Sequence, residues 1–90
     1  MNNYDIKINK YGTKYYYVNN VLHREDGPAI ELVNGHKACY KNGKIHREDG
    51  PAIEYADGNK YWFLNDKCYG DGDKFTNESW IKFIKTLIFY

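Results

Sequence analysis

The stretch "HREDGPAIE" occupies residues 23–31, and the same nine letters return at residues 46–54. Each copy joins a histidine, an arginine and two carboxylates to a glycine–proline turn. Such a phrase could be a catalytic cluster, with these side chains acting on a substrate. It could also be a polar corner that every unit of a repeat protein must build. The pattern in the rest of the chain favours the second interpretation.

The recurrence extends well beyond the duplicated phrase. Gly12, Gly35 and Gly58 fall 23 residues apart, and a lysine follows two residues after each of them. Aromatic-rich segments continue the same spacing, with YYY at 15–17, ACY at 38–40 and YWF at 61–63. Self-similarity at a fixed period of this length is typical of repeat proteins, in which each unit packs on the next. We therefore predict about three units of 23 residues.

Turn signals within each unit predict β-hairpins. The pairs NG at 34–35 and 42–43 and DG at 57–58 favour type I′ turns, in which both central residues have positive φ. Runs rich in Tyr, Trp, Phe, Val and Ile separate them and favour strands. We expect an antiparallel β-meander in which strands adjacent in sequence pair. The expected strands are 4–9, 14–19, 21–24, 29–33, 36–41, 44–47, 52–56, 59–64 and 67–69.

The hydrophobic period changes near the C-terminus. In TNESWIKFIKTLIFY (76–90) the apolar residues recur at helical spacing and form one stripe, which comprises Trp80, Phe83, Ile84, Leu87 and Ile88. Thr76 or Asn77 can supply the N-cap, and Glu78 suits the first turn. We predict a mainly β (α+β) single domain, with a repeat meander over 1–75 and an amphipathic capping helix over 76–90.

Composition limits the classes of partner. Thirteen Lys and Arg residues nearly balance twelve Asp and Glu residues, giving a net charge of +1. This balance does not favour a nucleic acid or an anionic membrane as partner. The N-terminus has no apolar segment typical of a signal peptide, and two cysteines, Cys39 and Cys68, do not make a disulfide framework. We expect a reduced, cytoplasmic protein, in the host cytoplasm if it is encoded by a phage.

The catalytic and metal-binding interpretations of the phrase are weak. His23 and His46 could act as bases, but no serine or cysteine recurs with them as a nucleophile. For a metal ion, the charges of Arg24 and Arg47 would oppose the cation. We therefore predict no enzymatic activity, no metal and no cofactor.

As a structural corner, the phrase has a role for each residue type. We expect Asp26 to accept backbone hydrogen bonds across its turn, and Arg24 to reach Glu25, Glu48 or Asp49 on the neighbouring corner in a ladder of opposite charges. Each imidazole should bond a backbone carbonyl. The predicted corner residues are His23, Arg24, Asp26, Gly27, Pro28, His46, Arg47, Asp49, Gly50 and Pro51.

The two copies of HREDGPA, with the flanking NG or DG pairs and paired aromatics, resemble the MORN-like repeats of about 23 residues found in bacteria, phages and large DNA viruses. The resemblance covers about residues 12–69. It implies a twisted antiparallel ribbon that serves as a scaffold or an interaction surface, and it implies no enzyme activity.

The surplus of aromatic residues predicts a protein-binding surface. Ten Tyr, four Phe and two Trp exceed what a single-layer ribbon with one helix can bury. Because side chains alternate between faces along a strand, the predicted binding residues share one parity: Tyr15, Tyr17, Tyr40, Tyr61 and Phe63. Trp62 and Trp80 are expected in the core instead. We expect a phage-type accessory protein that binds and inhibits a host defence or restriction protein.

Other functions remain open. The chain could form a dimer that sequesters a nucleotide-like signal between Arg24, Arg47, Lys14, Lys37 and Lys60, or it could be a purely structural scaffold. Single-stranded nucleic acid on tyrosine platforms is a weaker alternative, because the chain lacks a basic excess. In every case we expect a homodimer, formed through LIFY (87–90) or through the N-terminal edge strand.

Overall fold

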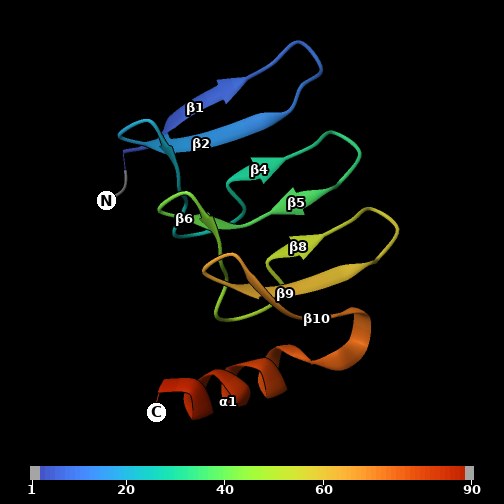
Figure 1. The fold of residues 1–90 in the computed structure, drawn as a ribbon. Coiled ribbons are helices and arrows are strands. Elements are labelled where there is room, and N and C mark those ends of the chain that lie inside the picture. Colours follow the sequence, from blue (N-terminus) through green and yellow to red (C-terminus); the bar gives the residue numbers. More distant parts are fainter. Residues whose placement is uncertain (1–2, 89–90) are drawn as a thin grey trace.

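The computed structural model describes residues 3–88 and shows a mainly antiparallel β-protein with one C-terminal helix (Figure 1). The strands are short and twisted, as the aromatic and β-branched runs between turn signals favour. In chain order the elements are β1 (Asp5–Ile8), β2 (Lys14–Val18), β3 (Val21–Leu22), β4 (Ile30–Glu31), β5 (Lys37–Ala38), β6 (Tyr40–Lys41), β7 (Lys44–Ile45), β8 (Ile53–Glu54), β9 (Lys60–Leu64), β10 (Lys67–Asp71), the 3-10 turn η1 (Gly72–Lys74) and α1 (Asn77–Ile88).

The main sheet has the order β1-β2-β4-β5-β8-β9-β10, with β3 paired to β2, while β6 and β7 form a separate pair. The expected pairing of consecutive strands therefore holds within each hairpin but not between β3 and β4 or between β7 and β8. In both places the HREDGP corner carries the chain back across the ribbon. β4 then pairs with β2, and β8 pairs with β5.

The strand expected over 36–41 is divided at Cys39. The Cys39 N–H donates to the Ala52 carbonyl at 2.7 Å, whereas the Cys39 carbonyl accepts from the His46 N–H at 3.0 Å. The two sides of one residue thus bond to different neighbours, and the chain passes from the main sheet into the β6–β7 pair. Tyr16 divides its hydrogen bonds in the same way, between Ala29 and His23.

Two kinds of turn alternate along the chain. The NG pair at 42–43 has positive φ at both residues, which confirms the type I′ prediction there, and the pairs at 19–20 and 65–66 share this geometry without the sequence signal. The prediction is wrong for 34–35 and 57–58. Gly35 donates to the Leu32 carbonyl and Leu32 donates to the His36 carbonyl, so the loop has three residues and only its glycine has positive φ.

The C-terminal helix begins where the sequence predicts. The Thr76 hydroxyl accepts from the Ser79 N–H at 3.0 Å, and the Ser79 hydroxyl accepts from the Thr76 N–H at 2.8 Å. These reciprocal bonds satisfy N–H groups that a helix N-terminus otherwise leaves without partners. The helix α1 ends at Ile88 in the structure, and residues 89–90 of the predicted helix lie outside the described residues.

The core lies between the last strands and the helix. Trp62 and Trp80 are fully buried and pack at a ring distance of 5.6 Å, which confirms their predicted place, and Ile84 completes the cluster. Each indole also has a hydrogen-bond acceptor: Trp62 donates to the Gly72 carbonyl at 3.1 Å and Trp80 to the Arg47 carbonyl at 2.9 Å. The helix is therefore tied both to the last strands and to the second corner.

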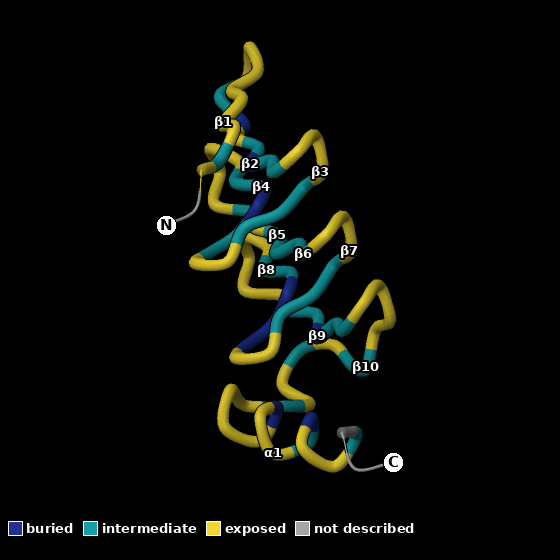
Figure 2. The backbone as a smooth tube through the Cα atoms, turned by 90° about the vertical axis from the view of Figure 1, so that its left-hand side faces the viewer, coloured by how far each residue is buried: buried dark blue, intermediate teal, exposed yellow. Residues whose placement is uncertain are grey.

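The molecule measures about 41 × 30 × 20 Å, and its strands follow one another along the long axis, from β1 at one end to α1 at the other (Figure 2). Among the described residues, no helix combines the length and the apolarity that crossing a membrane would require.

Candidate interaction surface

Strand register divides the main sheet into two chemically different faces. Residues directly opposite each other on paired strands share a face. One row of such partners is charged with alternating sign and comprises Lys14, Glu31, Lys37, Glu54 and Lys60. The adjacent row points to the other face and comprises Tyr15, Ile30, Ala38, Ile53 and Tyr61. The charged row lies on the face of the corners, and the apolar row begins and ends with two of the predicted binding residues, Tyr15 and Tyr61.

Each arginine of the duplicated phrase closes its own corner. The Arg47 Nε donates to Asp49 at 2.8 Å, and its Nη1 donates to the Pro51 carbonyl and to Glu54, each at 3.1 Å. Arg24 makes the equivalent bonds in the first corner at 3.0–3.1 Å. The predicted ladder of arginine pairs between neighbouring corners is therefore wrong. The planar guanidinium is already bonded to three acceptors, an aspartate and a carbonyl of its own corner and a glutamate of the strand that follows, so it does not reach the next corner.

The glycine of each corner makes room for the arginine. A Cβ added at Gly50 would lie 2.7 Å from the Arg47 Cζ, and one at Gly27 would lie 3.0 Å from the Arg24 Cζ. A larger residue at either position would therefore crowd the guanidinium and require it or the backbone to shift. In the first corner the guanidinium also lies 4.0 Å from the centre of the Tyr16 ring, a favourable cation–π distance.

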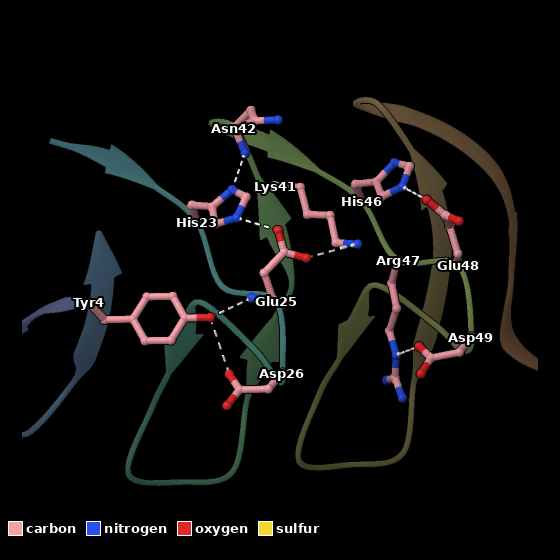
Figure 3. Close-up of polar contacts among 10 residues, drawn as sticks. All are labelled: Tyr4, His23, Glu25, Asp26, Lys41, Asn42, His46, Arg47, Glu48 and Asp49. Carbon is pink, nitrogen blue, oxygen red and sulfur yellow. Dashed lines mark hydrogen bonds and ion pairs between the residues drawn. The ribbon is translucent and has the colours of Figure 1, made fainter. Parts of the chain in front are cut away.

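Each histidine joins its corner to the following turn. The Nδ1 of His23 accepts from the Asn42 N–H at 2.9 Å, and its Nε2 lies 2.7 Å from the Glu25 carboxylate (Figure 3). His46 makes the same contacts with Asn65 and Glu48. The predicted bond to a backbone carbonyl is thus wrong, because Nδ1 accepts from a backbone donor. This arrangement fits the neutral tautomer with hydrogen on Nε2.

The acids of the first corner are held in their ionised form. The hydrogen bond from Arg24 lowers the pKa of Asp26, and the Asp26 backbone N–H adds to this effect, so the backbone contact that we expected is secondary. The hydrogen bond from His23 and the charge of Lys41, 3.6 Å away, lower the pKa of Glu25. Burial is the largest single effect on the pKa of Arg24 and would lower it, but the hydrogen bond to Asp26 and the charges of Asp26, Glu31 and Tyr16 together outweigh burial, so the net shift of this pKa is upward.

Tyr4 lies beside the first corner on its N-terminal side, which is the side where another corner would pack if the repeat continued. Its hydroxyl accepts from the Glu25 N–H at 2.8 Å and lies 3.4 Å from Asp26 (Figure 3). Its ring packs edge-on against Tyr16, with the ring centres 5.7 Å apart. The first corner is thereby supported from the N-terminal side by one tyrosine.

A groove of about 550 Å³ separates the two corners on the charged face. Its lining brings together Arg24, Arg47 and Lys37 from the predicted nucleotide-binding set, whereas Lys14 and Lys60 lie outside it. Four cationic side chains in the lining face five carboxylates, and both guanidiniums already hold carboxylates. Such a groove does not concentrate anions. Its one thiol, Cys39, has a pKa raised by burial and is not an activated nucleophile.

The structure places the predicted binding residues as half-buried rings. Tyr15 and Tyr17 stack at 6.4 Å on β2, Tyr61 and Phe63 share the same parity on β9, and Tyr40 lies on β6 in the smaller sheet. None of the five belongs to the cluster around Trp62 and Trp80. Tyr15 and Tyr61 are joined by the apolar row across the sheet, so the structure connects residues from both ends of the predicted surface.

Sequence reasoning missed part of this face. Tyr55 is 40% exposed and packs edge-on against Tyr61 at 5.7 Å and against the His36 ring at 5.0 Å. Leu32, at the equivalent position of the preceding hairpin, is also exposed. Both share the parity of Ile30 and Ile53, and this is the signal that could have identified them. We define the aromatic face as Tyr15, Tyr17, Ile30, Leu32, His36, Ile53, Tyr55, Tyr61 and Phe63. Strand register does not place the predicted Tyr40 on this face, because β6 pairs only with β7.

The side chains of His23 and His46 do not come together at a common site, because each bonds its own corner and the turn that follows it. Within residues 3–88, no group of three or more His, Cys, Asp or Glu side chains has a geometry that could hold a metal ion. Comparison of the chain with family models, curated proteins and solved structures found no match.

Proposed function

We propose that the chain is a non-enzymatic scaffold of three 23-residue hairpin units and that its aromatic face binds another protein. The observation that carries this proposal is the contrast between the two faces. One face is occupied by arginine and histidine networks that satisfy each other, and the other presents adjoining tyrosine, histidine and isoleucine side chains that, within residues 3–88, take no part in the core cluster around Trp62 and Trp80. Tyrosine-rich surfaces of this kind provide large contact area at low entropic cost.

The recurrence of contacts supports the three-unit description. Glycines with positive φ recur at 12, 35 and 58, two-residue turns recur at 19, 42 and 65, and the arginine and histidine bonds of the first corner recur in the second. The third unit has no such corner. There the Trp80 indole bonds the Arg47 carbonyl, and α1 takes the place of a further unit.

The more specific role, inhibition of a host defence or restriction protein by a phage-type accessory protein in the host cytoplasm, stays a prediction from the sequence, as does the likeness to MORN-like repeats. Sequestration of a nucleotide has less support than protein binding. The groove that would hold the nucleotide is lined by five carboxylates and four cationic side chains, and those carboxylates would repel phosphate.

Affinity capture followed by direct titration tests the proposal. A tagged chain is used to capture proteins from a lysate of the source cell, and each captured protein is purified and titrated calorimetrically with the wild-type chain. The decisive comparison uses Tyr55→Arg on the aromatic face and Tyr11→Arg at a hairpin tip, where the tyrosine is 72% exposed and outside the face. We expect Tyr55→Arg to weaken binding at least about tenfold, as loss of a contact aromatic does at protein interfaces, and Tyr11→Arg to leave it unchanged.

Equal binding by the two variants would refute the role of the aromatic face. A thermal shift of the wild-type chain with nucleotides, abolished by Lys37→Ala, would favour sequestration in the groove instead.

A further inference from the structure

The strand β1 forms an uncovered edge of the main sheet. It lies at the end of the strand order, opposite to the end that α1 covers, and all four of its residues are exposed. Ile6 and Ile8 are 53% and 61% exposed although they are the apolar half of an alternating DIKI strand. An edge of this kind offers unpaired backbone groups to another strand.

The hydrogen-bond alternation of the first hairpin fixes which backbone groups point outward. Asn9 donates to the Thr13 carbonyl, and the register of β1 and β2 places Lys7 opposite Tyr15 and Asp5 opposite Tyr17. Hydrogen-bonded pairs alternate along an antiparallel ladder. Asp5 and Lys7 therefore bond inward to β2, while the N–H and C=O groups of Ile6 and Ile8 point to the free edge.

We propose that β1 pairs antiparallel with β1 of a second copy of this chain, about a two-fold axis at Ile6. In this register Ile6 faces Ile6 of the second copy, and both carry outward-pointing backbone groups. Asp5 faces Lys7 of the second copy, and Lys7 faces Asp5. Hydrogen-bonded and non-bonded pairs thus match along the strand, and two pairs of opposite charge lie directly across from each other.

Other registers of the same two strands fit less well. An axis at Lys7 would also match the backbone groups, with Ile6 opposite Ile8 of the second copy, but it would set two lysines opposite each other and leave Asp5 without an opposite charge. An axis at Ile8 would match the backbone groups but leave Asp5 without an opposite charge. Within residues 3–88 neither Asp5 nor Lys7 forms an ion pair, and Lys7 only approaches the Tyr17 ring at 5.4 Å. Both charges are therefore available to the second copy.

Pairing at β1 would join two sheets into one. Asp5 and Lys7 share the face of Tyr17 and Tyr15, so the aromatic faces of both copies would become continuous across the axis. This inference does not depend on the proposed protein partner, and the dimer can be tested with the purified chain alone. Because a four-residue edge buries little surface, we expect association over roughly the micromolar to millimolar range.

Sedimentation equilibrium on charge variants tests the register. The wild-type chain should show a mass that rises with concentration toward twice 10.7 kDa. Asp5→Lys or Lys7→Asp alone places like charges opposite each other twice, and each should weaken the dimer at least about tenfold. The double variant Asp5→Lys/Lys7→Asp restores both opposite-charge pairs and should dimerise like the wild type. An equimolar mixture of the two single variants should form heterodimers.

A backbone variant tests the hydrogen bonds independently of charge. Ile6→Pro removes an outward N–H and leaves the bonds to β2 in place, so it should abolish dimers while far-UV circular dichroism stays unchanged. A wild-type chain that remains monomeric at millimolar concentration would overturn the proposal. Dimers that persist equally in both single charge variants would also overturn it, because they would have to use another surface. LIFY is the other surface expected from the sequence, and its residues 89–90 lie outside the described residues.

Discussion

Replacing Arg47 by methionine removes the guanidinium from the second corner and keeps most of the aliphatic stem. Pro51 is buried, and its carbonyl accepts from Arg47 Nη1 at 3.1 Å, so the substitution leaves a buried acceptor without its partner. An unsatisfied buried group of this kind costs about 1–3 kcal/mol. Asp49 and Glu54 are exposed enough to be hydrated again, so losing these two pairs adds about 0.5 kcal/mol. We expect the free energy of unfolding to fall by about 1.5–3.5 kcal/mol in total.

Urea denaturation followed by circular dichroism measures this loss. For a domain of this size each kcal/mol lowers the thermal midpoint by about 4–8 °C, so Arg47→Met should lower it by roughly 6–28 °C. The matched control is Lys82→Met on the exposed side of α1, which should change the free energy of unfolding by less than about 0.5 kcal/mol. If Arg47→Met costs no more than this control, the corner does not stabilise the fold and its residues must be retained for another purpose.

Three further predictions follow from the core, the acids and the thiols. Trp80→Phe leaves the Arg47 carbonyl without its indole donor and opens a gap beside Trp62, so it should destabilise the fold by about 2–3 kcal/mol in urea titrations. Hydrogen bonds lower the pKa values of Glu25 and Asp49 in the folded state below their ordinary values of 4.5 and 3.8. Their contribution to stability is therefore complete above about pH 5 and is lost as the pH falls through the lowered folded values. Asp49→Asn should flatten the decline of the thermal midpoint below pH 5; an equally steep decline would contradict the assignment. Cys68 is exposed, whereas burial raises the pKa of Cys39. A thiol reagent should therefore modify Cys68 first, with Cys39 reacting much more slowly, and equal rates measured by mass spectrometry would contradict the structure.

Features that depend on local chemistry were predictable from the sequence. The apolar stripe through Trp80 and Ile84 predicted the helix and its buried side, and Thr76 predicted its start. The mainly antiparallel β-architecture followed from turn signals between aromatic and β-branched runs. In each of these cases the residues that decide the structure lie within a few positions of one another.

Features that depend on distant pairing were not predictable. The NG pairs at 34–35 and 42–43 are identical in sequence but form different turns, because the strand hydrogen bonds place Gly35 at the last position of a three-residue loop and Gly43 within a two-residue turn. Arg24 had several carboxylates within reach along the chain, and only the folded corner shows that its own turn supplies the acceptors. The parity of Tyr55 could have been read from the expected strand 52–56, but its contacts with the Tyr61 and His36 rings depend on strand pairing and could not.

The central claim is that the duplicated phrase is a structural corner. A hydrogen bond to the Nδ1 of each histidine joins its corner to the next turn. Long-range ¹H–¹⁵N correlation of the histidine rings at neutral pH tests it most directly. The account predicts that His23 and His46 both carry hydrogen on Nε2, and that their Nδ1 atoms show couplings across hydrogen bonds to the amides of Asn42 and Asn65. Rings that exchange between both tautomers, with no coupling to these amides, would contradict it.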